Sequence, residues 1–177
     1  TLQKGPDYFV RAAKRVLEQD PSVLFIVAGS GDMERQMILE AANSGISNQV
    51  LFAGFLRGDD LTAMYKSADL FVMPSVSEPF GITPLESIIA GAPVLISRQS
   101  GVSEVLTHAL KVDFWDTDDM ANKIVGVISH DSLKNTLWEN SREELKRINW
   151  DAAAKKCVDY YEEIMCECGA PKDALYV

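Results

Sequence analysis

Apolar residues along this chain alternate between helical spacing and short continuous runs. Residues 7–17 repeat apolar side chains one and two helical turns apart, which predicts a helix with one buried face. The apolar positions of this helix are Phe9, Ala12, Ala13, Val16 and Leu17. Residues 22–29, SVLFIVAG, form a continuous apolar run that ends at a glycine, and this pattern predicts a strand buried on both faces.

The same alternation continues toward the C-terminus. Strands are predicted at residues 49–54, 69–74, 93–97 and, from a weaker pattern, 109–114. Helices are predicted from about Met33 to Asn43, from Asp59 or Asp60, over residues 84–90 and 101–106, and in three further segments, the last within residues 150–168. Strands that alternate with helices form βαβ units with right-handed crossovers. The predicted fold class is therefore α/β, with a doubly wound, Rossmann-like parallel sheet.

The start of the chain departs from that fold in one respect. Residues 1–6 form a loop that leads straight into a helix, whereas a doubly wound domain normally begins with a strand. We expect one further strand before Thr1, in a longer protein. The chain of 177 residues is long enough for one domain with a hydrophobic core. Residues 1–177 are interpreted as one Rossmann-like domain, truncated at its N-terminus, with residues 150–168 as its closing helix.

Charge and cysteine content narrow the possible settings. The net charge of -9 argues against non-specific binding to nucleic acid or to an anionic membrane. Three cysteines, all after residue 156, make a poor disulfide framework and indicate a reducing, cytoplasmic setting. The longest apolar runs are far below the roughly 18 residues that a membrane-spanning helix needs. We expect no nucleic-acid partner and no transmembrane segment.

Two glutamates stand eight positions apart in residues 77–87, SEPFGITPLES. Glu78 lies in the loop after a predicted strand and Glu86 in the first turn of the next helix, at the edge of a parallel sheet where ligands bind. Thr83 is the predicted N-cap of the helix and forms a capping box with Glu86. Such a capping box would explain Glu86 without any ligand. For Glu78 the alternative is a solvated loop carboxylate. The N–H groups of the first turn suit a phosphate, and Glu86 suits the hydroxyl groups of a ribose.

A helix terminus alone cannot hold a nucleotide. It contributes roughly 0.3–1 kcal/mol, and up to about 2 when partly buried, whereas a micromolar ligand needs about 8 kcal/mol. Lys4, in the first loop and at the same sheet edge, is the natural phosphate cation, although an ordinary surface lysine is the alternative. Gly29 and Ser30 form a second candidate loop, but the sequence after them lacks the full G-x-G-x-x-G pattern.

With these residues in place, the chain resembles the large retaining glycosyltransferase family that includes glycogen synthases and sucrose synthases. The resemblance runs from KGPDYFVRAA through LFIVAGSGD and VLFAGFL to SGVSEVL, and the segment EPFGITPLE matches the Glu-x7-Glu motif of that family. Residues 97–124 resemble the glycogen synthase-like branch. The resemblance implies the GT-B arrangement, in which an N-terminal domain binds the acceptor and a C-terminal domain, here this chain, binds the sugar nucleotide.

The resemblance also implies a role for each site residue. Glu78 would contact the donor sugar, Lys4 would neutralise the diphosphate, and Glu86 would bind the ribose hydroxyl groups. Backbone groups of Phe80, Gly81, Ile82 and Thr83 would meet sugar and phosphate, and Gly54, Phe55 and Leu56 would border the base pocket. The UDP-, ADP- or GDP-sugar is a substrate, and the resemblance requires no metal or other cofactor.

Two departures from the family limit what we expect of this chain by itself. The phosphate-binding arginine of the family would precede Thr1, as would the acceptor domain, so we expect little or no turnover from the isolated chain. Ser103 replaces the proline of a Gly-Gly-x-Pro-Glu pattern. Two alternatives stay open: an enzyme such as an epimerase that uses a sugar nucleotide without transferring the sugar, and a non-catalytic nucleotide-sugar-binding module.

Overall fold

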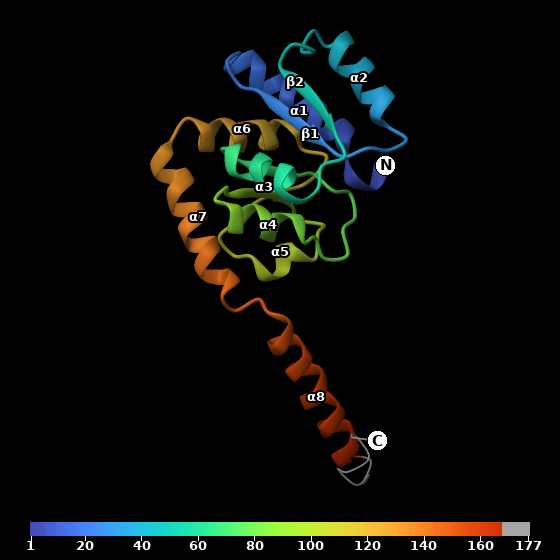
Figure 1. Cartoon of the computed structure of the whole chain (residues 1–177), viewed down its shortest axis with the longest axis vertical. Coiled ribbons are helices and arrows are strands. Elements are labelled where there is room, and N and C mark those ends of the chain that lie inside the picture. The colour runs from blue at the N-terminus through green and yellow to red at the C-terminus, as the bar shows by residue number, and fades with distance from the viewer. Residues whose placement is uncertain (168–177) are drawn as a thin grey trace. The chain divides into compact units, whose positions relative to one another are not determined.

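The computed structural model describes residues 1–167, which fall into two compact units divided after Arg142. In the first unit helices and strands alternate (Figure 1). Its elements are the short 3-10 helix η1 (Leu2–Lys4), α1 (Pro6–Gln19), β1 (Phe25–Ala28), α2 (Glu34–Asn43), β2 (Val50–Gly54), α3 (Gly58–Ser67), β3 (Phe71–Met73), α4 (Thr83–Ala90), β4 (Val94–Ser97), α5 (Val102–Val105), β5 (Leu110–Val112) and α6 (Thr117–Ile128). The predicted order of helices and strands is confirmed.

The helix α7 (Asp131–Leu145) crosses the division between the units, and α8 (Trp150–Glu167) belongs to the second unit. The N–H of Ala152 donates to the side-chain oxygen of Asn149 at 2.7 Å and so caps the first turn of α8. The predicted closing helix extends to Cys168, which lies outside the described residues. Over residues 1–167, no helix combines the length and the apolar character needed to cross a membrane.

All strand pairs are parallel, which confirms the α/β class, but they form two sheets instead of one. One sheet has the order β1-β2 and the other the order β3-β4-β5. A doubly wound fold places its six strands side by side in the order 3-2-1-4-5-6. In that order β2 and β1 correspond to strands 3 and 2, and β3, β4 and β5 correspond to strands 4, 5 and 6. Strand 1 of the order would lie between the two sheets. The strand expected before Thr1 stays a prediction.

The main core is formed by buried side chains of α1, α2 and α6 together with those of β1, β2, β4 and β5. Of the predicted buried positions of α1, Ala12, Ala13 and Val16 are fully buried and Phe9 and Leu17 are half-buried, whereas Val10, which was not predicted, is 1% exposed. Arg15 of α1 donates to the hydroxyl of Thr117, at the start of α6, at 3.1 Å, and the two helices lie side by side in Figure 1.

The prediction that the first strand is buried on both faces is wrong. Phe25 of β1 is buried, but Ile26 is 43% exposed, and its register partner in β2, Leu51, is 60% exposed. Only the face that carries Phe25 and Val50 joins the core of the described residues. The strand buried along its whole length is β4. A continuous apolar run therefore marked a strand correctly and overstated its burial.

A close backbone contact joins the loop before α1 to the end of β3. Gly5 has a φ of 63°, and a Cβ atom on it would lie 2.1 Å from the carbonyl oxygen of Pro74. Only glycine fits this position, because both the left-handed backbone and the missing space exclude a side chain. Gly5 therefore sets how near the first loop lies to the loop that follows β3.

We predict that Gly5→Ala lowers the free energy of unfolding by more than about 1–2 kcal/mol, the usual cost of a left-handed backbone alone. The matched control is Gly126→Ala in α6, where a Cβ would meet open space, and this change should stabilise the fold by about 0.5–1 kcal/mol. Urea unfolding measures both values. Equal stability of the two variants would contradict the contact.

Candidate functional site

The site is built on the loop of residues 74–82, between β3 and α4. On one side this loop contacts the first loop of the chain, because the N–H of Val76 donates to the carbonyl of Gln3 at 2.9 Å. The two loops carry Glu78 and Lys4. Their contact confirms that both lie at the same edge of the structure, which was inferred from the direction of the parallel strands.

Lys4 and Glu78 form a direct ion pair, in which the ammonium group donates to Oε2 of the carboxylate. The Glu78 side chain is only 12% exposed, whereas that of Lys4 is 58% exposed. The carboxylate is thus fixed in the loop, and the cation reaches it from the surface. A phosphate that binds Lys4 must compete with Glu78 for the ammonium group.

On its other side, the loop of residues 74–82 is held by the loop after β4. The N–H of Gly101 donates to the carbonyl of Glu78 at 2.9 Å, and the N–H of Val102 donates to that of Phe80 at 2.7 Å. A Cβ on Gly101 would lie 2.1 Å from the carbonyl oxygen of Pro79, so this approach also requires glycine. The backbone around Glu78 is therefore braced from both sides.

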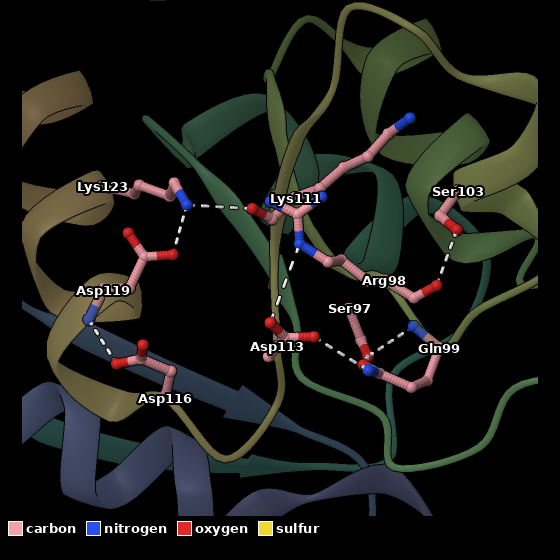
Figure 2. Close-up of polar contacts among 9 residues, drawn as sticks. All are labelled: Ser97, Arg98, Gln99, Ser103, Lys111, Asp113, Asp116, Asp119 and Lys123. Atoms are coloured by element: carbon pink, nitrogen blue, oxygen red, sulfur yellow. Dashed lines mark hydrogen bonds and ion pairs between the residues drawn. The ribbon is translucent and has the colours of Figure 1, made fainter.

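Side chains at the ends of β4 and β5 fix the bracing loop in turn (Figure 2). Gln99 accepts from the hydroxyl of Ser97 at 2.8 Å and donates to Asp113 at 3.0 Å. The Ser103 hydroxyl donates to the carbonyl of Arg98 at 2.9 Å, and the Arg98 guanidinium lies 3.9 Å from Asp113. Ser103, the departure from the family pattern, thus closes the turn into α5.

Glu86 lies in the first turns of α4 and receives a hydrogen bond from outside its own helix. The hydroxyl of Tyr65, in α3, donates to Oε2 of Glu86 at 3.2 Å. Tyr65 is 4% exposed, and burial, followed by the charge of Glu86 and this hydrogen bond, raises the pKa of Tyr65 to about 12. Tyr65 was not singled out from the sequence.

The predicted capping box between Thr83 and Glu86 is wrong. The helix begins one residue earlier than expected, with Ile82 as its N-cap and no side-chain cap bond. The Thr83 hydroxyl lies 3.8 Å from the sulfur of Met73, and Glu86 bonds to Tyr65 instead. The shift by one position places Glu86 beyond the N3 position that a capping box requires.

The remaining predicted positions divide between the same loop and a second group. Gly81 is buried, with a φ of 101°, whereas Phe80, Ile82 and Thr83 are exposed. In the second group, Gly29 donates to the carbonyl of Gly54 at 2.6 Å, which joins the ends of β1 and β2. Beside them, Ser30 is exposed, Leu56 is half-buried, and Phe55 is 62% exposed with the Arg57 guanidinium 4.7 Å from its ring centre.

A hollow of about 530 Å³ lies elsewhere, along α2, and is lined by Asp32, Arg35, Gln36, Leu39, Glu40, Asn43 and Ser44. It contains none of the paired or braced residues described above. Ligands of open parallel sheets bind outside the carboxyl ends of the strands, so we assign the site to the loop of residues 74–82. Within residues 1–167, no group of three or more His, Cys, Asp or Glu side chains is placed to hold a metal ion.

Comparison with known proteins decides the family. The family described as "Glycosyl transferases group 1" matches residues 1–144. This chain is a member of the group 1 glycosyltransferase family. It is 36% identical over 170 residues to an uncharacterized glycosyltransferase of Methanocaldococcus jannaschii. That alignment covers 93% of the chain and 43% of the relative, so this glycosyltransferase chain spans less than half the length of the relative.

Solved structures share the fold of this glycosyltransferase chain. HepE of Anabaena, solved with UDP and glucose, matches 92% of the chain with a TM-score of 0.78 and 20% identity, over 46% of its own length. A variant of TarM of S. aureus, solved with UDP and other ligands, matches 89% of the chain with a TM-score of 0.79 and 19% identity, over 32% of its own length. At these identities the likeness establishes a common GT-B-like, Rossmann-like domain fold.

The raised pKa of Tyr65 predicts a loss of stability at high pH. The phenol ionises near its ordinary value of 10.0 in the unfolded chain and near 12 in the folded chain, so its contribution is complete below pH 10 and is lost as the pH rises through 12. The difference in unfolding free energy between the unaltered chain and Tyr65→Phe should therefore fall by roughly 2–3 kcal/mol across this interval. Urea unfolding at a series of pH values measures it, and a constant difference would contradict the assignment.

Proposed function

We propose that this chain is the nucleotide-sugar-binding domain of a retaining GT-B glycosyltransferase of the glycogen synthase-like branch. The observation that carries the proposal is the Lys4–Glu78 ion pair on a braced loop whose far end presents Glu86. Lys4 thus offers a cation for phosphate, and Glu78 and Glu86 offer carboxylates for hydroxyl groups. Membership of the group 1 family supports the transfer of a sugar as the reaction.

The diphosphate of the donor binds between Lys4 and the first turn of α4. Pro84 has no N–H and that of Leu85 donates to the carbonyl of Ile82 at 2.9 Å, so the N–H groups offered to an anion at this helix start are those of Ile82 and Thr83. Gly81 lets the loop pack closely around Glu78, because a Cβ on it would lie 3.1 Å from the side chain of Met73 and 3.2 Å from that of Glu78. When the bond to the sugar breaks, charge builds up on the departing diphosphate, and the Lys4 ammonium group stabilises that charge.

The two carboxylates bind the two sugars of the donor. Glu78 accepts hydrogen bonds from hydroxyl groups of the transferred sugar, and Glu86 accepts them from the ribose. Exposed Phe55, at the end of β2 beside the Gly29–Gly54 contact, borders the base. The presence of UDP in the solved HepE and TarM structures supports a nucleoside diphosphate as the ligand class.

The acceptor, in this proposal, is held by an N-terminal domain of a longer protein. The chain covers 43% of its Methanocaldococcus jannaschii relative, which leaves room for a second domain of similar size. The 177-residue chain alone then binds donor and transfers little or no sugar. Release of sugar from a radiolabelled donor by this chain at the rate of the longer protein would refute the division of roles.

We predict that one of UDP, ADP or GDP raises the unfolding temperature of the chain, and that Glu86→Ala weakens its binding about 10- to 100-fold. A hydrogen bond to a charged group contributes roughly 1.5–3 kcal/mol, and the loss of that binding free energy corresponds to this range of affinity. Unaltered chain at about 100 times the dissociation constant should gain about 2.7 kcal/mol of stability. Calorimetric titration measures the variant.

The control for that experiment is Asp131→Ala, which removes a first-turn carboxylate from α7 and should leave nucleotide binding unchanged. If none of the three nucleotides binds, or if both variants weaken binding equally, the assignment of Glu86 is wrong.

The Lys4–Glu78 pair predicts opposite effects for its two members. Lys4→Gln should weaken nucleoside diphosphate binding about tenfold, because a charge-assisted contact to phosphate is lost. Glu78→Gln should strengthen binding of the same ligand about two- to fivefold, because the phosphate no longer competes with a carboxylate. The control pair is Lys134→Gln and Asp69→Asn, an ion pair of 2.9 Å at the opposite end of β3, and neither change should matter. Weakened binding in Glu78→Gln would contradict the competition.

A further inference from the structure

We propose that Tyr65 is a positioning residue, which holds the Glu86 carboxylate in the orientation that receives the ribose hydroxyl groups. This inference rests on the proposed function, since it assumes that Glu86 binds the ribose. It adds a residue of α3 to a site whose other members lie on loops and at the start of α4.

Tyr65 is itself held firmly by its surroundings. Its ring is 4% exposed and packs edge-on against Phe71 of β3, with ring centres 5.6 Å apart and planes at 73°. Its carbonyl accepts the N–H of Ala68 at 3.2 Å, which closes the end of α3. The hydroxyl therefore has a fixed place, set by α3 and β3, from which it meets Glu86.

Glu86, in contrast, is exposed, and without a partner its side chain would move among several rotamers. The hydrogen bond from Tyr65 to Oε2 selects one of them. Ordering the carboxylate before the ligand arrives removes that ordering cost from the binding step. The donor of this hydrogen bond belongs to α3, so the orientation of Glu86 depends on a residue outside its own helix.

The hydrogen-bonding capacity of the carboxylate leaves room for the ligand. An ionised carboxylate offers about four acceptor positions on its two oxygens. Tyr65 occupies one of these on Oε2, so Oε1 and a second position on Oε2 remain for the two hydroxyl groups of a ribose. At neutral pH the phenol is protonated, since even its ordinary pKa of 10.0 lies well above 7, and it acts as the donor.

The test compares ligands that differ only at the hydroxyl groups that Glu86 is proposed to bind. Calorimetry on the 177-residue chain uses whichever of UDP, ADP or GDP binds, and the 2′,3′-dideoxy form of the same nucleotide. The variants are Tyr65→Phe, Glu86→Ala and the double variant. The control is Tyr8→Phe, another tyrosine packed edge-on against a phenylalanine, at 5.1 Å.

Tyr65→Phe should weaken binding of the ribonucleotide about three- to tenfold, in line with one hydrogen bond to a charged group, and leave the dideoxy form unchanged. In the Glu86→Ala background, where Tyr65 has no acceptor at position 86, Tyr65→Phe should cause no further loss. Tyr8→Phe should change neither affinity. Circular dichroism melting confirms that each variant is folded.

An equal loss for both ligands, no loss for either, or an undiminished loss in the Glu86→Ala background would each overturn the positioning role. These outcomes differ from failure of the proposed function. If the unaltered chain binds none of the three nucleotides, the proposed function fails, and the inference fails with it. If it binds the ribonucleotide more tightly than the dideoxy form and Tyr65→Phe has no effect, only the inference fails.

Discussion

The arrangement of the site depends on two close backbone contacts, one at each side of the loop after β3. Gly5 lies against the carbonyl of Pro74, and Gly101 lies against that of Pro79, each with room for a hydrogen atom but not for a Cβ. Between these contacts the loop turns Glu78 toward Lys4. Because backbone atoms make both contacts, the position of the backbone that carries Glu78 does not depend on flexible side chains.

The two glutamates are held in different ways, and this difference fits their proposed tasks. Glu78 is nearly buried, and its backbone carbonyl is bonded to the loop after β4. Glu86 is exposed, and a buried phenol from a neighbouring helix holds one of its oxygens. A fixed, shielded carboxylate suits contact with the transferred sugar, whereas an accessible one suits a ribose that enters and leaves with each nucleotide.

Much of the fold was predictable from the sequence, because apolar spacing distinguishes helices such as α1 from strands such as β2. Burial was harder to predict: the run of residues 22–29 shows how apolar β1 is, but not that Ile26 faces outward.

For the site, the direction of parallel strands was enough to bring Lys4 and Glu78 to one edge. The partnership of Tyr65 with Glu86 joins residues 21 positions apart on different helices, and local spacing carries no signal for it. The one available hint was a tyrosine on a helix face that must be buried, since a buried hydroxyl needs a partner. The predicted capping box between Thr83 and Glu86 was wrong because α4 begins one residue earlier than expected, and such a shift changes every side-chain pairing at the helix start.

The central claim is that a nucleoside diphosphate binds along the loop of residues 74–82 and the first turn of α4. The most direct test is an amide ¹H–¹⁵N NMR titration of the chain with UDP, ADP and GDP. The account predicts that the largest shift changes fall on the backbone of residues 78–86, with smaller ones at residues 54–56 and at Lys4. Shift changes confined to the hollow along α2, at residues 32–44, would contradict it.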